Sequence, residues 1–160
     1  MKKTIIIFFL LGLLSSFLAF AQSEKKGTII GTFGVGGGVG TIVETVGQFS
    51  FIFDLSLINQ TGLTLCLTDI VSTRSGALGP SQNIMFGIGY TYMKDKWNIG
   101  GTLIAAPTAQ DLLLGGKING GYYFSNNIGV TGALTYRQTA GIVSDMSMFD
   151  AFAGISIIFF

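Results

Sequence analysis

An alternation of apolar and polar residues recurs along the chain and constrains the fold more than any other feature. In segment 48–57 one parity is apolar and the other mostly polar: Phe49, Phe51, Phe53, Leu55 and Leu57 against Gln48, Ser50, Ile52, Asp54 and Ser56. A period of two places successive side chains on opposite faces of a β-strand. Seven more segments are predicted as strands: 29–35, 63–67, 83–92, 97–103, 112–124, 128–136 and 149–160. The chain is therefore expected to be all-β with eight strands.

Composition indicates where such a sheet resides. Hydrophobic residues make up 49% of the chain and charged residues 11%. After residue 21 the longest apolar run is 151–160, which Gly154 and Ser156 interrupt, and a helical span needs about 20 residues. Only helices and closed barrels satisfy their backbone hydrogen bonds in lipid. We therefore predict a closed, antiparallel, eight-stranded, transmembrane up-and-down β-barrel.

The first 21 residues have the pattern of a secretory signal peptide. Lys2 and Lys3 precede an apolar stretch, and Ala19-Phe20-Ala21 is a small-x-small cleavage site. Cleavage before Gln22 leaves residues 22–160 as a single barrel domain; the alternative is a retained helix over 5–21, near the lower length limit for a span. Because the only cysteine is Cys66, we expect no lipidated cysteine at the mature N-terminus and no internal disulfide.

Charge excludes one large class of partners. Removal of residues 1–21 takes away Lys2 and Lys3, which leaves seven basic and eight acidic residues, a net charge of −1. Nucleic-acid binding needs a basic surface. No nucleic-acid partner is therefore expected.

Connection lengths predict an orientation. Residues 59–61, 94–96 and 125–127 are short polar turns, whereas 36–46, 69–82, 106–111 and 138–147 are expected to be loops, most of them longer. Outer-membrane barrels have short periplasmic turns and longer outer loops, so both termini are expected on the periplasmic side. Aromatic residues beside the short turns and the C-terminus agree, since aromatic rings favour the headgroup level: Tyr92, Trp97, Tyr122, Phe124 and Phe160.

These features, with the terminal aromatic Phe160, make the chain resemble the small eight-stranded outer-membrane barrels, the family of OmpX, the OmpA transmembrane domain and OmpW. The resemblance covers 27–160 and implies that Phe160 is part of a C-terminal signal for the barrel-assembly machinery. Counting back from Phe160 by twos, however, turns Asp150 toward lipid. We therefore expect the upper half of segment 149–160 to follow the other parity, with a bulge near Gly154 or a Phe160 that does not face lipid.

The interior is expected to be filled. Parity directs Asp54, Lys117, Arg137 and Asp150 inward, where we predict a structural polar network, with Arg137 and Asp150 able to pair at the rim. An eight-stranded barrel is only wide enough to be filled by side chains. Several further inward positions are apolar, which argues against a continuous water pore: Ile30, Ile52, Met85, Ile104 and Leu113.

No enzyme is expected. The chain has no histidine, which removes Ser-His and Asp-His chemistry and the commonest metal ligand. No catalytic residue, metal site or cofactor is predicted. Cys66 has inward parity and is interpreted as a packed thiol, and the glycine run 34–40 lacks the Lys-Ser/Thr of a phosphate loop and is interpreted as loop tips and room for strand curvature.

Two function classes follow, with a third as a further alternative. The first is a structural or surface-interaction barrel whose outer loops contact host molecules, proteins or lipopolysaccharide. The second is a narrow carrier or channel for small hydrophobic compounds, which the OmpW-like branch of the resemblance implies. The third is a secreted lipocalin-like binder, in which the face of Phe49, Phe51 and Phe53 would point inward.

Overall fold

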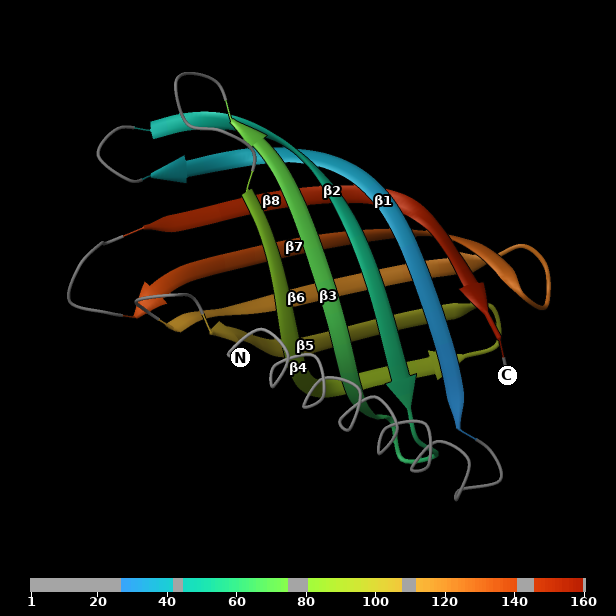
Figure 1. Ribbon diagram of the computed structural model, residues 1–160. Coiled ribbons are helices and arrows are strands. Elements are labelled where there is room, and N and C mark those ends of the chain that lie inside the picture. Colours follow the sequence, from blue (N-terminus) through green and yellow to red (C-terminus); the bar gives the residue numbers. More distant parts are fainter. Residues whose placement is uncertain (1–26, 42–44, 75–80, 108–111, 141–145, 160) are drawn as a thin grey trace, which may run out of the picture.

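The fold is seen in a computed structural model that describes residues 27–41, 45–74, 81–107, 112–140 and 146–159. The predicted signal peptide (1–21) and Phe160 lie outside these ranges. Eight strands follow one another along the chain (Figure 1): β1 (Thr28–Thr41), β2 (Thr45–Ile58), β3 (Leu63–Arg74), β4 (Ser81–Lys94), β5 (Trp97–Pro107), β6 (Leu112–Tyr123), β7 (Ile128–Ala140) and β8 (Ser147–Ile158).

The strands form one closed barrel in sequence order, and every neighbouring pair is antiparallel. Closure comes from β1, which pairs with β2 on one side and with β8 on the other (Figure 1). The predicted eight-stranded antiparallel barrel is thereby confirmed. Within the described ranges no helix is long and apolar enough to cross a membrane.

Strand register sets the tilt of the barrel. If each residue is followed to its partner on the next strand, a path that starts at Gly31 of β1 returns to β1 at Thr41. The offset after one turn around the barrel is therefore ten residues. The path is Gly31, Leu55, Leu67, Phe86, Ala105, Leu114, Gln138, Ser147 and Thr41. With about 3.3 Å per residue and about 4.8 Å between strands, this offset corresponds to a tilt of about 40°. Strands of this tilt leave an interior that only side chains can fill.

The glycine-rich segment is a strand, which corrects the predicted loop 36–46. β1 continues to Thr41 and β2 begins at Thr45, so only 42–44 separate them. A Cβ on Gly36 would lie 2.0 Å from the carbonyl oxygen of Ala151, and one on Gly38 would lie 1.9 Å from that of Phe149. Because these inward positions have no side chain, β1 can approach β8 closely where the barrel closes.

The other predicted loops are also shorter than expected. β3 extends through Asp69 to Arg74, β4 begins at Ser81, and β7 extends to Ala140. We call the ends joined by 59–62, 95–96 and 124–127 the turn rim, and those joined by 42–44, 75–80, 108–111 and 141–146 the loop rim. The two rims differ less in length than predicted, because regular β pairing carries the strands into segments that polar and glycine residues had suggested were loops. The orientation of the termini therefore remains a prediction.

The two faces of the sheet differ in the side chains that they present. Large apolar residues cover the outside, where Phe49, Phe51 and Phe53 of β2 are 50%, 40% and 54% exposed. The inside combines polar residues with an apolar cluster. In β8 the outward residues are Phe149, Ala151, Ala153, Ile155 and Ile157, the parity expected for its upper half, and Phe159 directly after the strand is exposed as well. This parity runs through the described part of β8 without a bulge, since its pairing with β1 and β7 is continuous.

Candidate functional site

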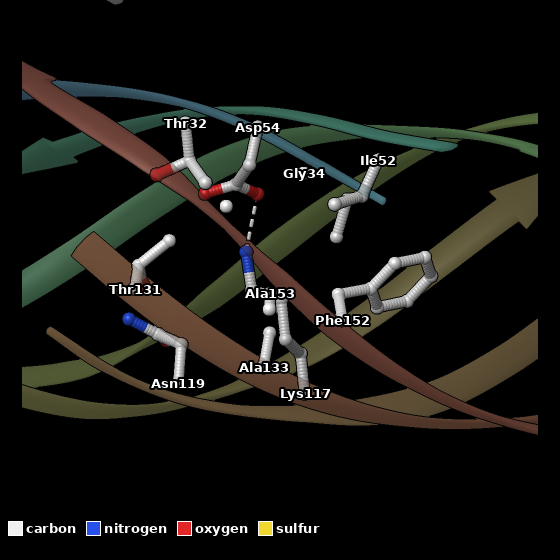
Figure 2. A pocket seen from close by; sticks show the side chains of 11 residues that line it. Thr32, Gly34, Ile52, Asp54, Lys117, Asn119, Thr131, Ala133, Phe152 and Ala153 are labelled. Carbon is white, nitrogen blue, oxygen red and sulfur yellow. Dashed lines mark hydrogen bonds and ion pairs between the residues drawn. The ribbon is translucent and has the colours of Figure 1, made fainter. Parts of the chain in front are cut away.

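The centre of the interior is an ion pair between strands on opposite sides of the barrel. Lys117 of β6 points inward and donates a hydrogen bond from Nζ to Oδ1 of Asp54 of β2 (Figure 2). Thr68 of β3 donates to the same carboxylate oxygen and accepts a hydrogen bond from Lys117 Nζ at 3.1 Å. Ser56 donates to the other oxygen of Asp54 at 2.8 Å. The pair is thus buried with its polar atoms bonded, as a charge in an enclosed interior requires.

A second ion pair lies closer to the loop rim. Arg137 of β7 donates from Nη2 to Oδ2 of Asp150 of β8, and both side chains are fully buried. Oδ1 of Asp150 accepts hydrogen bonds from Gln48 Nε2 at 2.6 Å and from Ser50 Oγ at 3.1 Å. The two residues are therefore inside the barrel and not exposed at its rim. Through its side chain, Asp150 of β8 therefore contacts both the neighbouring strand β7 and the more distant strand β2.

Apolar side chains separate the two ion pairs along the strands. On β2 the inward order is Ser50, Ile52, Asp54, and on β3 Ile70 lies between Ser72 and Thr68. We call the side chains at this level the apolar layer: Ile52, Ile70, Met85, Ile104 and Phe152, all members of one buried cluster. A layer of this kind opposes a continuous file of water between the charged groups.

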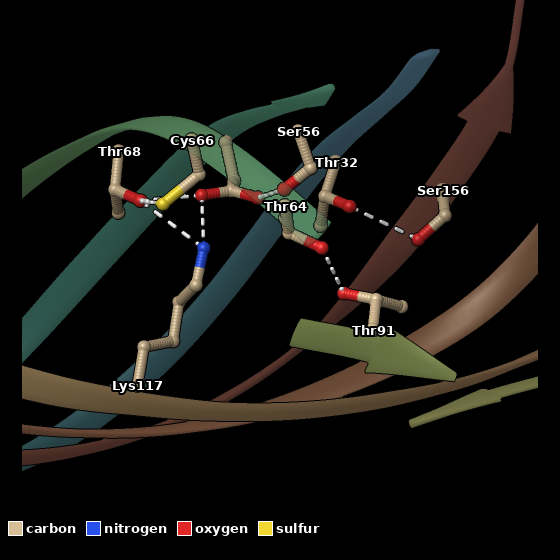
Figure 3. A network of polar contacts seen from close by, with 9 residues as sticks. Thr32, Ser56, Thr64, Cys66, Thr68, Thr91, Lys117 and Ser156 are labelled. Carbon is tan, nitrogen blue, oxygen red and sulfur yellow. Dashed lines mark hydrogen bonds and ion pairs between the residues drawn. The ribbon is translucent and has the colours of Figure 1, made fainter. Parts of the chain in front are cut away.

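Toward the turn rim the interior holds smaller polar contacts between uncharged side chains. Thr64 donates to Thr91 at 2.8 Å, and the hydroxyls of Thr32 and Ser156 are 3.0 Å apart (Figure 3). Further on, Asn98 donates to the hydroxyl of Tyr123 at 2.8 Å. The ring of Tyr123 packs with Ile30 and Ile58 in a second apolar cluster. Side chains therefore fill the interior toward this end as well.

Little free volume is left beside the central pair. A cavity of about 20 Å³ is lined by Asp54, Lys117, Thr32, Asn119 and Phe152 among others (Figure 2). A space of this size accommodates about one water molecule. It is too small for an organic ligand.

The remaining reactive side chains of the described interior have packing or hydrogen-bond contacts. Cys66 is buried beside Thr68, with the Thr68 hydroxyl 3.8 Å from its sulfur. No group of acidic, cysteine or histidine side chains that could hold a metal ion occurs among the described residues. Lys117 already bonds a carboxylate and a hydroxyl. The geometry of these residues suits cross-links between strands.

All four residues predicted for the interior network point inward, but they form two separate pairs. Asp54 contacts Lys117, and Arg137 contacts Asp150. Sequence reasoning did not name Gln48, Ser50 and Thr68 as their partners, although the parity of Asp54 and Cys66 places all three on the inward face. The predicted assembly residue Phe160 lies outside the described residues.

Aromatic residues gather on the outside near the turn rim. Trp97 of β5 is 64% exposed, and its ring centroid lies 4.7 Å from that of Tyr122 of β6. Tyr92 and Phe124 are exposed near the same end of the barrel. The rings of Phe33 and Phe51, and those of Phe49 and Phe51, contact each other on β1 and β2.

One carboxylate lies on the outside, in the middle of a strand. Asp69 of β3 has the parity of Leu65 and Leu67, and it pairs across the sheet with Phe53 and Ile84. Gln82 of β4 donates from Nε2 to Oδ2 of Asp69 at 2.8 Å. The sequence prediction had placed both residues in a loop. Extending the parity of 63–67 through Val71 would have placed Asp69 on the outside.

Comparison with known proteins identifies the fold. No family model matches the chain, and no curated protein matches it by sequence. Among solved structures the chain is similar to Neisserial surface protein A (NspA), with a TM-score of 0.64 and 10% sequence identity. The match covers 83% of this chain and 99% of NspA. At this identity the likeness is one of fold: both chains form the same kind of eight-stranded barrel.

Proposed function

We propose that this chain is an integral outer-membrane barrel with a structural or surface-interaction role and a filled lumen. The observation that carries the proposal is the distribution of side chains. Aromatic and aliphatic residues cover the outside, whereas both ion pairs are inside. A protein dissolved in water has the opposite arrangement. An apolar outer surface of this kind is compatible with a lipid environment.

Strand length supports the same proposal. A strand tilted by about 40° crosses a hydrocarbon layer of about 25 Å with roughly ten residues. The observed strands have 11 to 14 residues. Trp97 and Tyr122 lie where the strands end, the usual level of an interfacial aromatic girdle. The similarity to a protein named for the Neisserial surface agrees with an outer-membrane location.

The filled interior favours a structural or surface role over a carrier. A carrier for hydrophobic compounds needs an enclosed apolar cavity of several hundred Å³, whereas the cavity at the central pair holds about 20 Å³. A larger hollow of about 660 Å³ is lined mainly by outward residues such as Ile88, Leu103 and Ile118. A lipocalin-like binder needs apolar residues around an inner pocket, and here Phe49, Phe51 and Phe53 point outward. By the same reasoning we propose that the chain is not an enzyme.

In this proposal, lipid and lipopolysaccharide surround the outside and the barrel-assembly machinery inserts the chain. Residues of the loop rim would contact surface partners, with both termini in the periplasm. These loops are short, so contact would involve a small area of the loop rim.

Fractionation and gel migration test the location. The expressed full chain should sediment with outer membranes and, without boiling, run on gels at a position that heating changes. Heating unfolds a closed barrel that detergent alone leaves intact. Recovery in the soluble fraction without detergent would contradict the proposal, and a protein that migrates identically with and without boiling would contradict the closed barrel.

A further inference from the structure

Asp69 is an acidic side chain where an outer wall in lipid would ordinarily be apolar. It is the seventh of twelve residues of β3, near the middle of the proposed membrane crossing. Its neighbours on the outside, Phe53 and Ile84, are 54% and 44% exposed. Ionisable side chains within the membrane are costly to place and commonly mark a functional contact. The position therefore needs a partner that offsets its cost.

The barrel itself satisfies only one of the two carboxylate oxygens of Asp69. Gln82 Nε2 bonds Oδ2 of Asp69, while Oδ1 is buried and has no hydrogen-bond partner among the described residues. Both ion pairs of the described residues lie inside the barrel, so neither reaches Asp69. An amide nitrogen carries two hydrogens, and the side chain of Gln82 is exposed. Because Oδ1 is enclosed, the acceptor that the partly exposed Asp69 presents on the wall is Oδ2, next to the second hydrogen of the Gln82 amide.

A donor and an acceptor side by side on one surface are complementary to the same surface on a second copy. A twofold axis along the membrane normal places each Gln82 amide opposite the other copy's Asp69 carboxylate at the same depth. The two contacts are then equivalent, as in a symmetric dimer interface. Phe51, Phe53 and Ile84 supply the apolar area around them.

We propose that the β2–β4 wall around Asp69 and Gln82 is a self-association surface, at which two copies of this chain exchange Asp69–Gln82 hydrogen bonds within the membrane. This proposal rests on the proposed membrane location. A cationic membrane partner would also suit Asp69. The second copy is favoured because Gln82 already supplies the donor that Asp69 needs.

Energy transfer between labelled copies tests the proposal. The full chain is labelled at Asp95→Cys in the turn rim, in a Cys66→Ala background, and donor- and acceptor-labelled copies are reconstituted together in phosphatidylcholine vesicles at decreasing protein-to-lipid ratios. Heat-modifiable migration is checked first, so that failure of insertion is recognised separately and counts against the proposed function. Inserted wild-type copies should show energy transfer above the level expected for randomly placed monomers, and this excess should persist as the protein is diluted in lipid.

Two variants and one matched control locate the interface. Asp69→Leu and Gln82→Leu each remove two hydrogen bonds from the dimer and should weaken association by roughly tenfold to a hundredfold. Gln138→Leu makes the same change at an exposed glutamine of β7 and should leave transfer unchanged. Inserted wild-type barrels that show only random transfer would overturn the proposal, as would transfer that survives Asp69→Leu and Gln82→Leu.

A variant that reverses the charge of Asp69 distinguishes binding of a second copy from binding of a cationic partner. Mixed vesicles of Asp69→Lys and wild-type chains pair a cation with the carboxylate across the interface. They should show more transfer than Asp69→Lys chains alone, in which two cations meet. If energy transfer occurs in the mixed vesicles but not in vesicles of wild-type chains alone, the wall accepts a cationic partner and not its own copy. That result would overturn self-association.

Discussion

Lys117 of β6 and Asp54 of β2 form an ion pair across the barrel interior, between strands that are four places apart in a closed sheet of eight. Thr68 and Ser56 complete the hydrogen bonds of the carboxylate. The contact joins two walls that have no backbone pairing with each other. It therefore holds the cross-section of the barrel from within.

Removing the cation alone should destabilise the barrel. Lys117→Met leaves the Asp54 carboxylate buried without its partner, which typically lowers the free energy of unfolding by about 3–5 kcal/mol. The double variant Asp54→Leu/Lys117→Met should recover much of this loss, since no charge is left unpaired. Urea unfolding of the refolded protein in vesicles measures both. Lys96→Met, at an exposed turn, is the control, and an equal effect of Lys96→Met and Lys117→Met would refute the structural role of the pair.

The single tryptophan should report the membrane interface. Trp97 is the only tryptophan of the chain and is exposed on the outside near the turn rim. On insertion its emission should shift to shorter wavelength, and lipids brominated close to the headgroup should quench it more than lipids brominated near the chain ends. Stronger quenching by lipids brominated near the chain ends would place the turn rim inside the hydrocarbon layer. It would contradict an interfacial aromatic girdle at this rim.

Sequence reasoning predicted strand number and the direction of most side chains because the period of two is a local property of the chain. It predicted closure because a sheet in lipid can leave no edge unpaired. Asp150 is an example: its charge required the inward parity that β8 adopts. The predicted loops failed because loop propensity is also local. Glycine and polar residues favour loops in isolation, but hydrogen bonding to β8 and β2 keeps residues 36–41 in β1.

The contacts of the interior were less predictable than its composition. Parity indicates that all four charged residues face inward, and the hairpin of β7 and β8 brings Arg137 beside Asp150 as the sequence suggested. The contact between Asp54 and Lys117, by contrast, depends on the register offset around the barrel. That offset arises from eight ladders together, so no single segment encodes it. Asp69 was missed for another reason, because its charge suggested a loop although its neighbours Leu67 and Val71 continue the strand.

Glycines at the junction of β1 and β8 should tolerate no side chain. A Cβ on Gly154 would lie 2.2 Å from the carbonyl oxygen of Phe33, and backbone cannot move aside cheaply. Gly154→Ala should lower the free energy of unfolding by about 1–3 kcal/mol. The control Gly132→Ala points outward with its nearest atom at 3.7 Å and should raise stability by about 0.5–1 kcal/mol. Urea midpoints measure both, and equal midpoints would show that β1 and β8 are not closely packed there.

The apolar layer should block ion flow. Planar bilayers containing the refolded protein should show no steady conductance, because Met85 and Phe152 fill the space between the charged pairs. Met85→Ala/Phe152→Ala should create openings by admitting water at this level. Asp54→Asn/Lys117→Gln keeps the layer and should remain silent. Steady wild-type channels would contradict the filled lumen, provided that each protein shows heat-modifiable migration.

The pairing of β1 with β8 also determines when the barrel can form. Every other ladder joins strands that are consecutive along the chain, whereas each pair of this one joins residues more than 100 positions apart. Local hairpins can assemble early, but closing so long a loop costs chain entropy that only the last strand can offset. Until β8 arrives, β1 has an open edge of unpaired backbone groups, which lipid cannot satisfy. In the proposed membrane location, β8 must therefore be present before the barrel can insert stably.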